Sequence, residues 1–301
     1  MRTNVNSNKS KSTWYLISRL ISKVVIIVLF MKISGCAKHS DTLHGDKIEN
    51  HGDYIIRFTG AKAYNERIRF LIMHYTALDD SRSIKELTNG NVSAHYLIPK
   101  FYESANGQHV VLQLVDENKR AWHAGVSSWN GRSNLNDTSI GIEIVNPGYN
   151  DISGKRIWYP YGENQITALA ALAKDIINRY QITPDNVLGH SDIAPLRKQD
   201  PGKLFPWERL AAIGVGAWPD SKSVKKYLFG RSPHAQANVG VIQSLLKQYG
   251  YDQTPQNGIL DENTRKILSA FQMHFRQSNI SGNADAETEA IVRALLEKYR
   301  H

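Results

Sequence analysis

The segment from Gly189 to Gly202, GHSDIAPLRKQDPG, restricts the possible fold more than any other part of the chain. It contains two prolines. Because proline removes a backbone donor and fixes φ, a continuous helix or a central strand is excluded and a loop is predicted. This loop carries His190, Lys198 and Asp200. Imidazole and carboxylate groups are zinc ligands, and reactive side chains commonly lie on loops held by a scaffold. The segment therefore predicts a functional site that other parts of the chain complete.

Length and charge limit the classes of function. A chain of 301 residues is long enough for about two domains. Its formal net charge is +9, but residues 1–36 hold six basic residues and no acidic one, so only three of the nine charges lie beyond residue 36. The small remaining charge does not predict a nucleic-acid partner.

Residues 1–36 are typical of an export signal. A basic and polar opening precedes the apolar run VVIIVLFM at 24–31, which is much shorter than the span of about 20 residues that crosses a bilayer. Ile33-Ser34-Gly35-Cys36 follows, and Cys36 is the only cysteine. This pattern resembles a bacterial lipobox, which implies a lipid anchor at Cys36. Ala37 after it implies an outer-membrane lipoprotein that faces the periplasm of a Gram-negative bacterium. An uncleaved anchor helix is the alternative.

Composition divides the rest of the chain into four parts. Residues 37–52 are polar and without periodicity, and we interpret them as a tether. Residues 53–218 form the predicted first domain, with an α/β pattern. Residues 219–236 are polar, with proline and glycine, and are interpreted as a linker. Residues 237–301 form a second, small domain.

Short apolar runs predict the strands of the first domain. Residues 67–76, RIRFLIMHYT, suit a buried strand with His74 at its end, where a side chain can point into a cleft. Further elements are predicted as follows: strands at 95–98 and 110–115, and a helix at 83–88. We interpret His95 as hydrogen-bonded within the sheet rather than as a ligand, because three protein ligands suffice for a catalytic zinc.

A further strand is predicted at 139–146, SIGIEIVN. Its isoleucines alternate with Gly141, Glu143 and Val145, so one face is aliphatic and buried. Glu143 lies on the other face, beside the space that Gly141 leaves. A carboxylate in so apolar a strand is costly to bury unless it is paired or functional, and a buried glutamate has the raised proton affinity of a general base. A solvent-facing strand residue is the alternative.

Two aromatic residues predict a substrate contact. The segment AWHAG at 121–125 places Trp122 and His123 between small residues, which allow close approach of another molecule. An aromatic face suits stacking on a sugar or packing on a peptide. His123 is therefore a candidate for substrate binding, with a packing role as the alternative.

Helices are predicted on either side of the Gly189–Gly202 loop. Residues 165–180 have apolar side chains at helical spacing, with Asn164 as a plausible N-cap. Residues 237–301 are consistent with three helices, the last two capped by Asp261 and Asp285. This small domain has seven basic and seven acidic side chains, so it lacks the basic surface of a helix-turn-helix DNA reader.

Several motifs together resemble the type 2 N-acetylmuramoyl-L-alanine amidase family of zinc enzymes. They are, in chain order, HYT at 74–76, SAHYLI at 93–98, AWHAG at 121–125, GIEIVN at 141–146 and GHSDIAPLRKQDPG at 189–202. The resemblance implies a mixed central sheet flanked by helices. The later segment NGILDENTRKILSAFQMHF resembles the peptidoglycan-binding domain of cell-wall hydrolases, although a purely structural appendage remains an alternative.

The resemblance also implies roles for individual residues. His74, His190 and Asp200 would hold Zn²⁺, Glu143 would be the acid/base residue, and Lys198 would stabilise the oxyanion. The implied reaction is hydrolysis of the amide bond between N-acetylmuramic or anhydromuramic acid and L-alanine in peptidoglycan stem peptides.

The chemistry of these residue types agrees with that reaction. Two neutral imidazoles and one carboxylate leave a zinc position open for water. The alternative is a non-catalytic peptidoglycan recognition protein on the same fold, but such a receptor needs neither a base nor an open metal site. A solvated loop lysine is the alternative for Lys198. We expect a monomer whose partners are peptidoglycan, muropeptides and the membrane that holds its lipid.

Overall fold

The computed structural model describes residues 48–101 and 106–300, and the chain divides into two compact units, residues 1–64 and 65–301. In the first unit, β1 (Ile48–Asn50) and β2 (Ile55–Arg57) form an antiparallel hairpin. Asn50 Oδ1 accepts a hydrogen bond from Gly52 N at 2.9 Å in its turn. The predicted boundary between residues 52 and 53 therefore falls inside this hairpin. The hairpin was not predicted, because strands this short show no apolar periodicity.

The predicted export signal at 1–36, with Cys36, lies outside the described residues, as does most of the predicted tether. Among the helices that the structure describes, none combines the length and the apolar character needed to cross a membrane.

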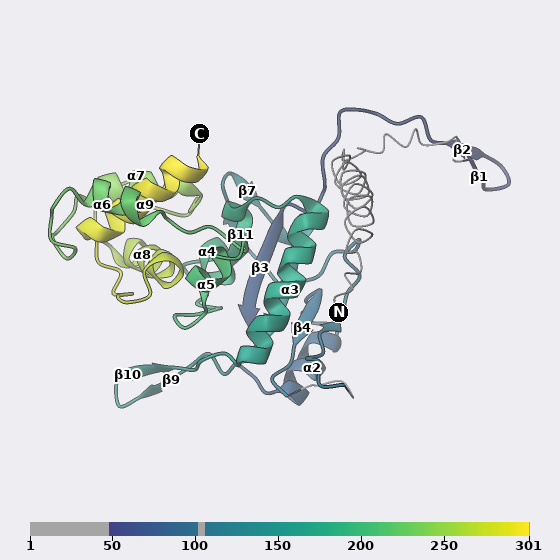
Figure 1. Cartoon of the computed structure of the whole chain (residues 1–301), viewed down its shortest axis with the longest axis horizontal. Helices are drawn as coiled ribbons and strands as arrows, with labels where there is room; N and C mark the ends of the chain where they lie inside the picture. Colours follow the sequence, from purple (N-terminus) through teal and green to yellow (C-terminus); the bar gives the residue numbers. More distant parts are fainter. Residues whose placement is uncertain (1–47, 102–105, 301) are drawn as a thin grey trace, which may run out of the picture. The chain divides into compact units, whose positions relative to one another are not determined.

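The second unit is built on a five-stranded sheet in the order β11-β3-β8-β4-β5. Figure 1 labels β3, β4 and β11 of this sheet. Its strands are β3 (Phe70–Tyr75), β4 (Tyr96–Ile98), β5 (Leu112–Gln113), β8 (Ser139–Ile144) and β11 (Val187–Gly189). The first four strands in that order are parallel, and β5 pairs antiparallel with β4. The mixed sheet, flanked by helices, confirms the predicted α/β fold.

Helix α3 (Glu163–Tyr180) covers one face of this sheet. One apolar cluster joins them, formed by helix residues Ile166, Leu169, Ala173 and Ile176 and strand residues Leu71, Met73, Ile140, Ile142 and Ile144. The helix is confirmed, but its N-cap is Gly162 and not Asn164, and Gly162 N donates to Gln165 Oε1 at 3.1 Å. Because strand side chains alternate, His74 and Glu143 lie on the opposite face.

Shorter elements connect the sheet. They are α2 (Asp80–Thr88), β6 (Ser128–Trp129), β7 (Arg132–Ser133), η1 (Leu135–Asp137), β9 (Tyr149–Ile152), β10 (Lys155–Trp158), η2 (Pro184–Asn186), α4 (His190–Ile193) and α5 (Trp207–Ala211). The predicted strand at 110–115 is reduced to β5. The predicted loop at 189–202 begins with the single turn α4, which ends before Pro195, so proline excludes a long helix there but not a short one.

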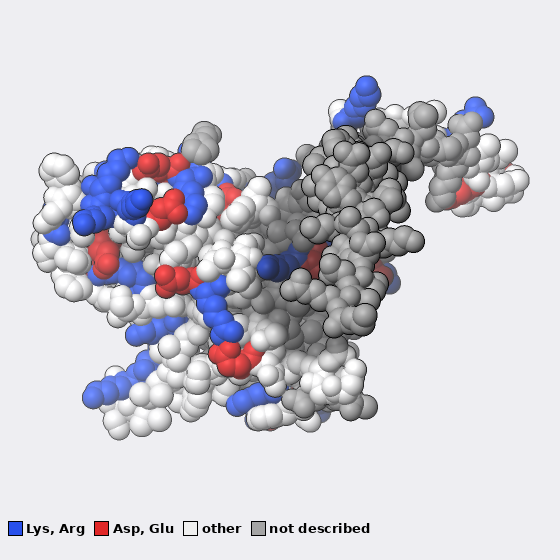
Figure 2. Space-filling view, viewed as in Figure 1, with Lys and Arg blue, Asp and Glu red and all other residues white. Residues whose placement is uncertain are grey.

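The chain ends in helices α6 (Ser221–Leu228), α7 (Val239–Tyr249), α8 (Glu262–Phe275) and α9 (Ala286–Tyr299). Asp261 and Asp285 accept hydrogen bonds from Thr264 N and Thr288 N, so both predicted N-caps are confirmed. The structure differs from the predicted linker at 219–236, because α6 lies within it and packs against α9. Figure 2 shows basic and acidic side chains interspersed on the visible face of these helices.

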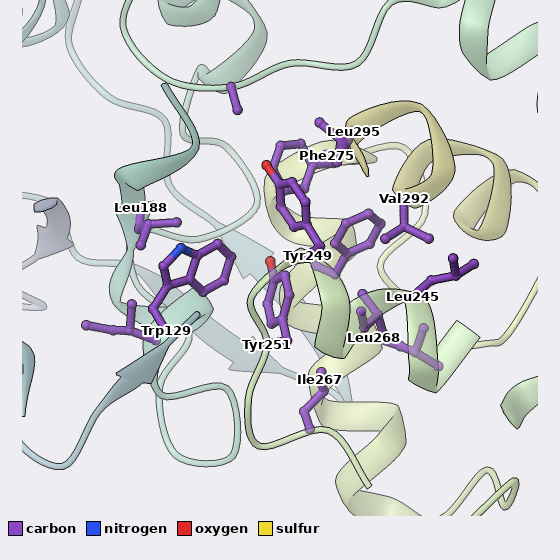
Figure 3. Close-up of a cluster of buried hydrophobic side chains, with 14 of the residues drawn as sticks. Trp129, Leu188, Leu245, Tyr249, Tyr251, Ile267, Leu268, Phe275, Val292 and Leu295 are labelled. Carbon is purple, nitrogen blue, oxygen red and sulfur yellow. The ribbon is translucent and has the colours of Figure 1, made fainter. Parts of the chain in front are cut away.

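The C-terminal helices share an apolar core with the sheet domain (Figure 3). Trp129 and Leu188 come from the sheet domain, Tyr249 and Phe271 come from α7 and α8, and Tyr251 follows α7. The Trp129 ring contacts the tyrosine rings edge-on, with centroids 5.8 Å and 5.0 Å away. The two parts of residues 65–301 are thus packed against each other rather than separated by a free linker.

Candidate metal centre and active site

The carboxyl ends of three adjacent parallel strands bring the predicted site residues together. His74 lies near the end of β3, Glu143 is its register partner on β8, and His190 follows β11 directly. Parallel strands end at the same edge of a sheet, and open α/β sheets bind ligands outside that edge. Asp200 returns to this edge, where its backbone oxygen accepts a hydrogen bond from Ser191 N at 2.8 Å.

Three potential ligand atoms converge at this edge. His74 Nδ1, His190 Nδ1 and Asp200 Oδ2 lie 3.0 Å apart in each of the three pairs. All three side chains are buried. Among the described residues, they form the one cluster of three or more histidine, cysteine or acidic side chains whose ligand atoms are close enough to hold a metal ion.

The outer hydrogen bonds fix the protonation of both imidazoles. Ser139 Oγ donates to a backbone carbonyl at 2.6 Å, so it accepts from His123 Nε2 at 3.1 Å. His123 Nδ1 then accepts from His74 Nε2 at 3.0 Å. His190 Nε2 lies 3.2 Å from the carbonyl oxygen of Ala124 and 3.3 Å from Arg197 Nη2. Both hydrogens of Arg197 Nη2 go to the carbonyl oxygens of Ala124 and Val126, so His190 Nε2 donates to Ala124. Both Nδ1 atoms are therefore left without a proton, and their lone pairs face a carboxylate oxygen, an arrangement that a cation stabilises.

These donor atoms fit zinc. Zinc–nitrogen bonds of about 2.0 Å place tetrahedral ligand atoms about 3.3 Å apart, so the three atoms need to separate only slightly. Each ligating imidazole also has its second nitrogen held by a protein partner, which is the usual support of a metal-bound histidine. The residues present thus match a site with three protein ligands and one open position.

His123 supports His74 from behind. A Cβ atom placed on Gly141 would lie 2.4 Å from His123 Cγ, so the space that Gly141 leaves is filled by this imidazole and does not lie open beside Glu143. Both ring nitrogens of His123 have protein partners, and the residue is only 9% exposed. These contacts support the packing alternative, but His123 also lines the cavity beside the site, so its contact with substrate stays a prediction.

His95 lies in the sheet, as predicted. Its Nδ1 accepts a hydrogen bond from Gly141 N at 3.1 Å, and its Nε2 lies 3.1 Å from the carbonyl oxygen of Lys119, to which it donates. Both nitrogens are therefore occupied by the backbone. The structural interpretation of His95 is confirmed.

Burial and charge prepare the ligand residues for a metal, because ligands must be deprotonated to bind one. Burial lowers the pKa of His74 to about 4, although Asp200 opposes the shift. For Asp200, burial favours a higher pKa, but protonated forms of His190 and His74, which would donate to the carboxylate, outweigh it and hold the pKa well below its usual range. At neutral pH, His74 is thus neutral and Asp200 is ionised.

Glu143 is suited to accepting a proton. Burial and the nearby Asp200 carboxylate raise the pKa of Glu143 to about 8, and Lys198 opposes the shift. Its Oε2 atom is buried and has no hydrogen-bond partner in the part of the chain that the structure describes. A carboxylate that is free of partners and has a raised proton affinity has the properties of a general base. The solvent-facing alternative does not fit this environment.

Lys198 lies beside these groups. It is partly buried, and its charge lowers the pKa of both Glu143 and His74. Within residues 48–101 and 106–300, its Nζ atom has no hydrogen bond or ion pair. The neighbouring Arg197 is anchored instead, because its guanidinium donates to the carbonyl oxygens of Ala124 and Val126 at 2.5 Å and 2.8 Å. Lys198 is therefore the cation that remains available to a ligand here.

The cluster opens onto a cavity of about 360 Å³. Its lining includes Trp122, Glu143, Tyr149, Lys198 and Asp200. Trp122 is 58% exposed, and the guanidinium of Arg120 lies 4.4 Å from the centroid of its ring. The cavity thus combines a metal site, a base and an ammonium group with aromatic surfaces that suit a sugar or a peptide.

Several residues that hold the site were not predicted from the sequence. Asn136 Oδ1 accepts hydrogen bonds from His123 N and Ala124 N at 3.1 Å and 2.8 Å, which fixes the loop after β5. Ser139 fixes the His123 ring. The alternation in β8 places Ser139 on the face of Glu143, so a signal for Ser139 was present. No local pattern pointed to Asn136 or Arg197.

The predicted site residues lie within a part of the chain that matches a known protein family. The model of the N-acetylmuramoyl-L-alanine amidase family matches residues 64–203, a range that includes all five predicted catalytic and ligand residues. The model of a peptidoglycan binding domain matches residues 235–292.

Individual relatives extend the match to most of the chain. The N-acetylmuramoyl-L-alanine amidase AmiD of Escherichia coli (strain K12) is 46% identical over 276 residues, which cover 91% of this chain and 97% of that protein. The 1,6-anhydro-N-acetylmuramyl-L-alanine amidase AmpD of Enterobacter cloacae is 46% identical over 103 residues, 34% of this chain and 50% of that protein.

Two solved structures are similar over both parts of residues 65–301. AmiD from E. coli, in complex with the substrate anhydro-N-acetylmuramic acid-L-Ala-D-gamma-Glu-L-Lys, has a TM-score of 0.80 and 48% identity, and covers 84% of this chain and 98% of its own. AmpDh3 from Pseudomonas aeruginosa, in complex with anhydromuramic pentapeptide, has a TM-score of 0.72 and 43% identity, and covers 83% and 98%. The chain therefore belongs to the N-acetylmuramoyl-L-alanine amidase family and carries a peptidoglycan binding domain after its amidase domain.

Proposed function

We propose that the protein is a zinc-dependent N-acetylmuramoyl-L-alanine amidase. It hydrolyses the amide bond between N-acetylmuramic or anhydromuramic acid and the L-alanine of peptidoglycan stem peptides. The observation that carries the proposal is the convergence of His74 Nδ1, His190 Nδ1 and Asp200 Oδ2 at 3.0 Å, next to the unpartnered carboxylate of Glu143. The substrates named for the complexes of AmiD and AmpDh3 support the choice of bond.

The roles of the side chains follow from their positions. When bound by the three ligands, zinc supplies Lewis acidity, which acidifies water and polarises an amide carbonyl. Glu143 accepts the proton of the attacking water and returns it to the leaving amine of L-alanine. A pKa of about 8 in the absence of cation falls when a divalent charge lies nearby, so Glu143 is ionised and can act as a base at neutral pH.

Lys198 stabilises the transition state. Its ammonium group lines the same cavity as Glu143 and opposes the negative charge that develops on the carbonyl oxygen. A single donor of this kind typically contributes about 3 kcal/mol. Trp122, exposed at the same cavity, offers an aromatic surface to the glycan or the stem peptide.

Mass spectrometry of the products tests this function. Anhydro-muropeptide and intact sacculus are incubated with the enzyme before chelation, after chelation, and after zinc is restored. The expected products are a stem peptide with a free L-alanine amine and a sugar with a free lactyl carboxylate, released only when zinc is present. Undiminished release of the stem peptide by protein shown to be free of metal would contradict zinc dependence.

We further propose a lipid at Cys36, an outer-membrane location facing the periplasm, and a monomeric state. The lipobox-like segment that ends at Cys36 supports the lipid and its location. Mass spectrometry of the mature N-terminus decides the first point, because lipidation predicts a modified Cys36 as the first residue. An unmodified Met1 would contradict it.

A further inference from the structure

The buried carboxylate of Asp192 links the metal loop to the C-terminal helices. Asp192 lies in α4, two residues after His190, and is only 1% exposed. Because α4 is a single turn of four residues, it has too few internal hydrogen bonds to be stable alone. Contacts from outside α4 must therefore hold the backbone that carries His190.

Asp192 makes three hydrogen bonds. Its Oδ2 accepts from Gly189 N at 2.7 Å, a contact that caps α4 directly before His190. Its Oδ1 accepts from the Tyr251 hydroxyl at 2.6 Å, and its Oδ2 also accepts from His274 Nδ1 at 2.7 Å. Tyr251 and His274 both belong to the C-terminal part of the chain.

The His274 ring is fixed on both faces. It stacks on Trp207 of α5, with centroids 3.8 Å apart, and on Phe275, with centroids 3.9 Å apart. Its Nε2 atom is buried and has no partner within the described ranges, so its one polar contact is the bond to Asp192. An imidazole held this tightly places its donor with little freedom.

Residues between α7 and α8 make further contacts around α4. Gln253 Nε2 donates to the carbonyl oxygen of Ile193, the last residue of α4, at 3.3 Å. Tyr251 packs on Trp129 beside Leu188, the residue in the middle of β11 (Figure 3). The segment from β11 to α4 is thus contacted by residues of the C-terminal part that lie between α7 and α8.

We propose that Tyr251 and His274 are positioning residues for the metal centre, acting through Asp192 on the backbone of His190. The C-terminal part is then a structural component of the catalytic centre as well as a wall-binding module. This inference rests on the proposed function, because it assigns His190 to the metal. A contact that merely holds the two parts together would affect stability without affecting the metal.

The experiment compares variants of the full chain by competition with a fluorescent zinc chelator. Tyr251→Phe removes one hydroxyl. His274→Phe keeps a stacked ring and removes the donor, whereas His274→Asn keeps a donor near the position of Nδ1 and removes the ring. Asp252→Ala is the matched control, because Asp252 accepts from Gly131 N at 2.8 Å across the same interface without contacting α4.

We expect zinc affinity to fall about tenfold in Tyr251→Phe and His274→Phe, the low end of the range for outer-shell partners. We expect His274→Asn and Asp252→Ala to bind zinc with an affinity within about twofold of that of the wild type, well below the loss for outer-shell changes. Affinity equal to wild type in folded His274→Phe and Tyr251→Phe would overturn the inference. So would equal losses in His274→Phe and His274→Asn, because ring packing would then carry the effect.

A second readout needs no metal. Hydrogen exchange of the metal-free chain, followed in a peptide covering residues 187–196, reports the Gly189 amide that Asp192 holds. We expect faster exchange there in Tyr251→Phe and His274→Phe and no change in Asp252→Ala, and unchanged exchange in all variants would overturn the coupling. If the wild type bound no zinc but the variants still differed from it in exchange as expected, the proposed function would be contradicted and the coupling to α4 would stand.

Discussion

At the scale of single residues, the site depends on which atoms lack a partner. His74 and His190 each use Nε2 for a protein hydrogen bond and leave Nδ1 free, and Glu143 Oε2 has no partner among the described residues. In a protein interior, such unpaired polar atoms are costly unless something else satisfies them. A bound cation and a water molecule would satisfy all three.

Replacing Glu143 by glutamine tests the base. The amide keeps the size of the side chain and cannot accept the proton, so we expect kcat to fall by about 10²- to 10⁴-fold, the usual contribution of a general base. Zinc content is expected to stay at the level of the wild type, because Glu143 is not a ligand. Wild-type turnover of muropeptide by a zinc-loaded Glu143→Gln protein would rule out the proposed mechanism.

The same variant gives a pH signature in the metal-free protein. Burial raises the pKa of Glu143 from 4.5 to about 8, so its contribution to stability is fully present below pH 4.5 and is lost as the pH rises through 8. Glutamine does not titrate. Urea titrations in the presence of chelator measure the free energy of unfolding of both proteins. We therefore expect the value for Glu143→Gln to rise relative to that of the wild type as the pH increases from 5 to 8.5. A difference independent of pH would contradict the raised pKa.

Gly141 tests the support behind His74. A Cβ atom at this position would lie 2.4 Å from the His123 ring, so Gly141→Ala must displace the imidazole that holds His74. We expect a loss of about 10- to 100-fold in zinc affinity, as for other outer-shell changes. Gly240→Ala is the control, because its Cβ would meet its nearest neighbour at 3.4 Å. Similar zinc affinities in the two variants would count against the role of His123.

At the scale of elements, sequence patterns predicted the long and periodic ones. Helix α3 and the caps of α8 and α9 are confirmed because apolar spacing and an N-terminal aspartate are local signals. The turn α4 was not predicted because four residues show no periodicity, and the helix α6 was not predicted because its polar composition was interpreted as a linker. The candidate ligands were predicted from motifs, and the structure brings them together. The hydrogen bonds of His123 depend on where distant segments meet, which no local pattern contains.

The caps of α8 and α9 predict unequal losses of stability. Asp261 caps α8 from a half-buried position and has no buried ion pair, so Asp261→Ala should cost only what the loss of one N-cap costs. Asp285 caps α9 and is one of two carboxylates that pair with the buried Arg276, the other being Glu287, so Asp285→Ala removes the cap and one ion pair together and should cost more than the loss of a cap alone. Urea denaturation measures both. Equal losses of unfolding free energy in the two variants would show that the ion pair between Asp285 and Arg276 adds nothing to stability.

At the scale of the whole molecule, the amidase domain and the C-terminal helices share one apolar core. Trp129, Leu188 and Ile193 belong to the same cluster as Tyr251 and Phe271. The sequence indicated two domains with a linker, because composition reports what a segment is made of and not what it packs against. The shared core explains why helix α6 occupies part of the predicted linker.

A shared core predicts cooperative unfolding. Because neither part of residues 65–301 buries its apolar surface alone, we expect one calorimetric transition for this unit, and zinc should shift the whole transition to higher temperature. Two separate transitions, of which only one responded to zinc, would show that the amidase domain and the C-terminal helices unfold independently.

The central claim is that one zinc ion is held by His74 Nδ1, His190 Nδ1 and Asp200. Anomalous diffraction at the zinc absorption edge, from crystals of the zinc-loaded protein, tests it directly. The account predicts a single strong peak within bonding distance of these three atoms, with an open position facing the cavity next to Glu143. A well-diffracting crystal of active enzyme with no peak there, or with zinc on other side chains, would contradict it.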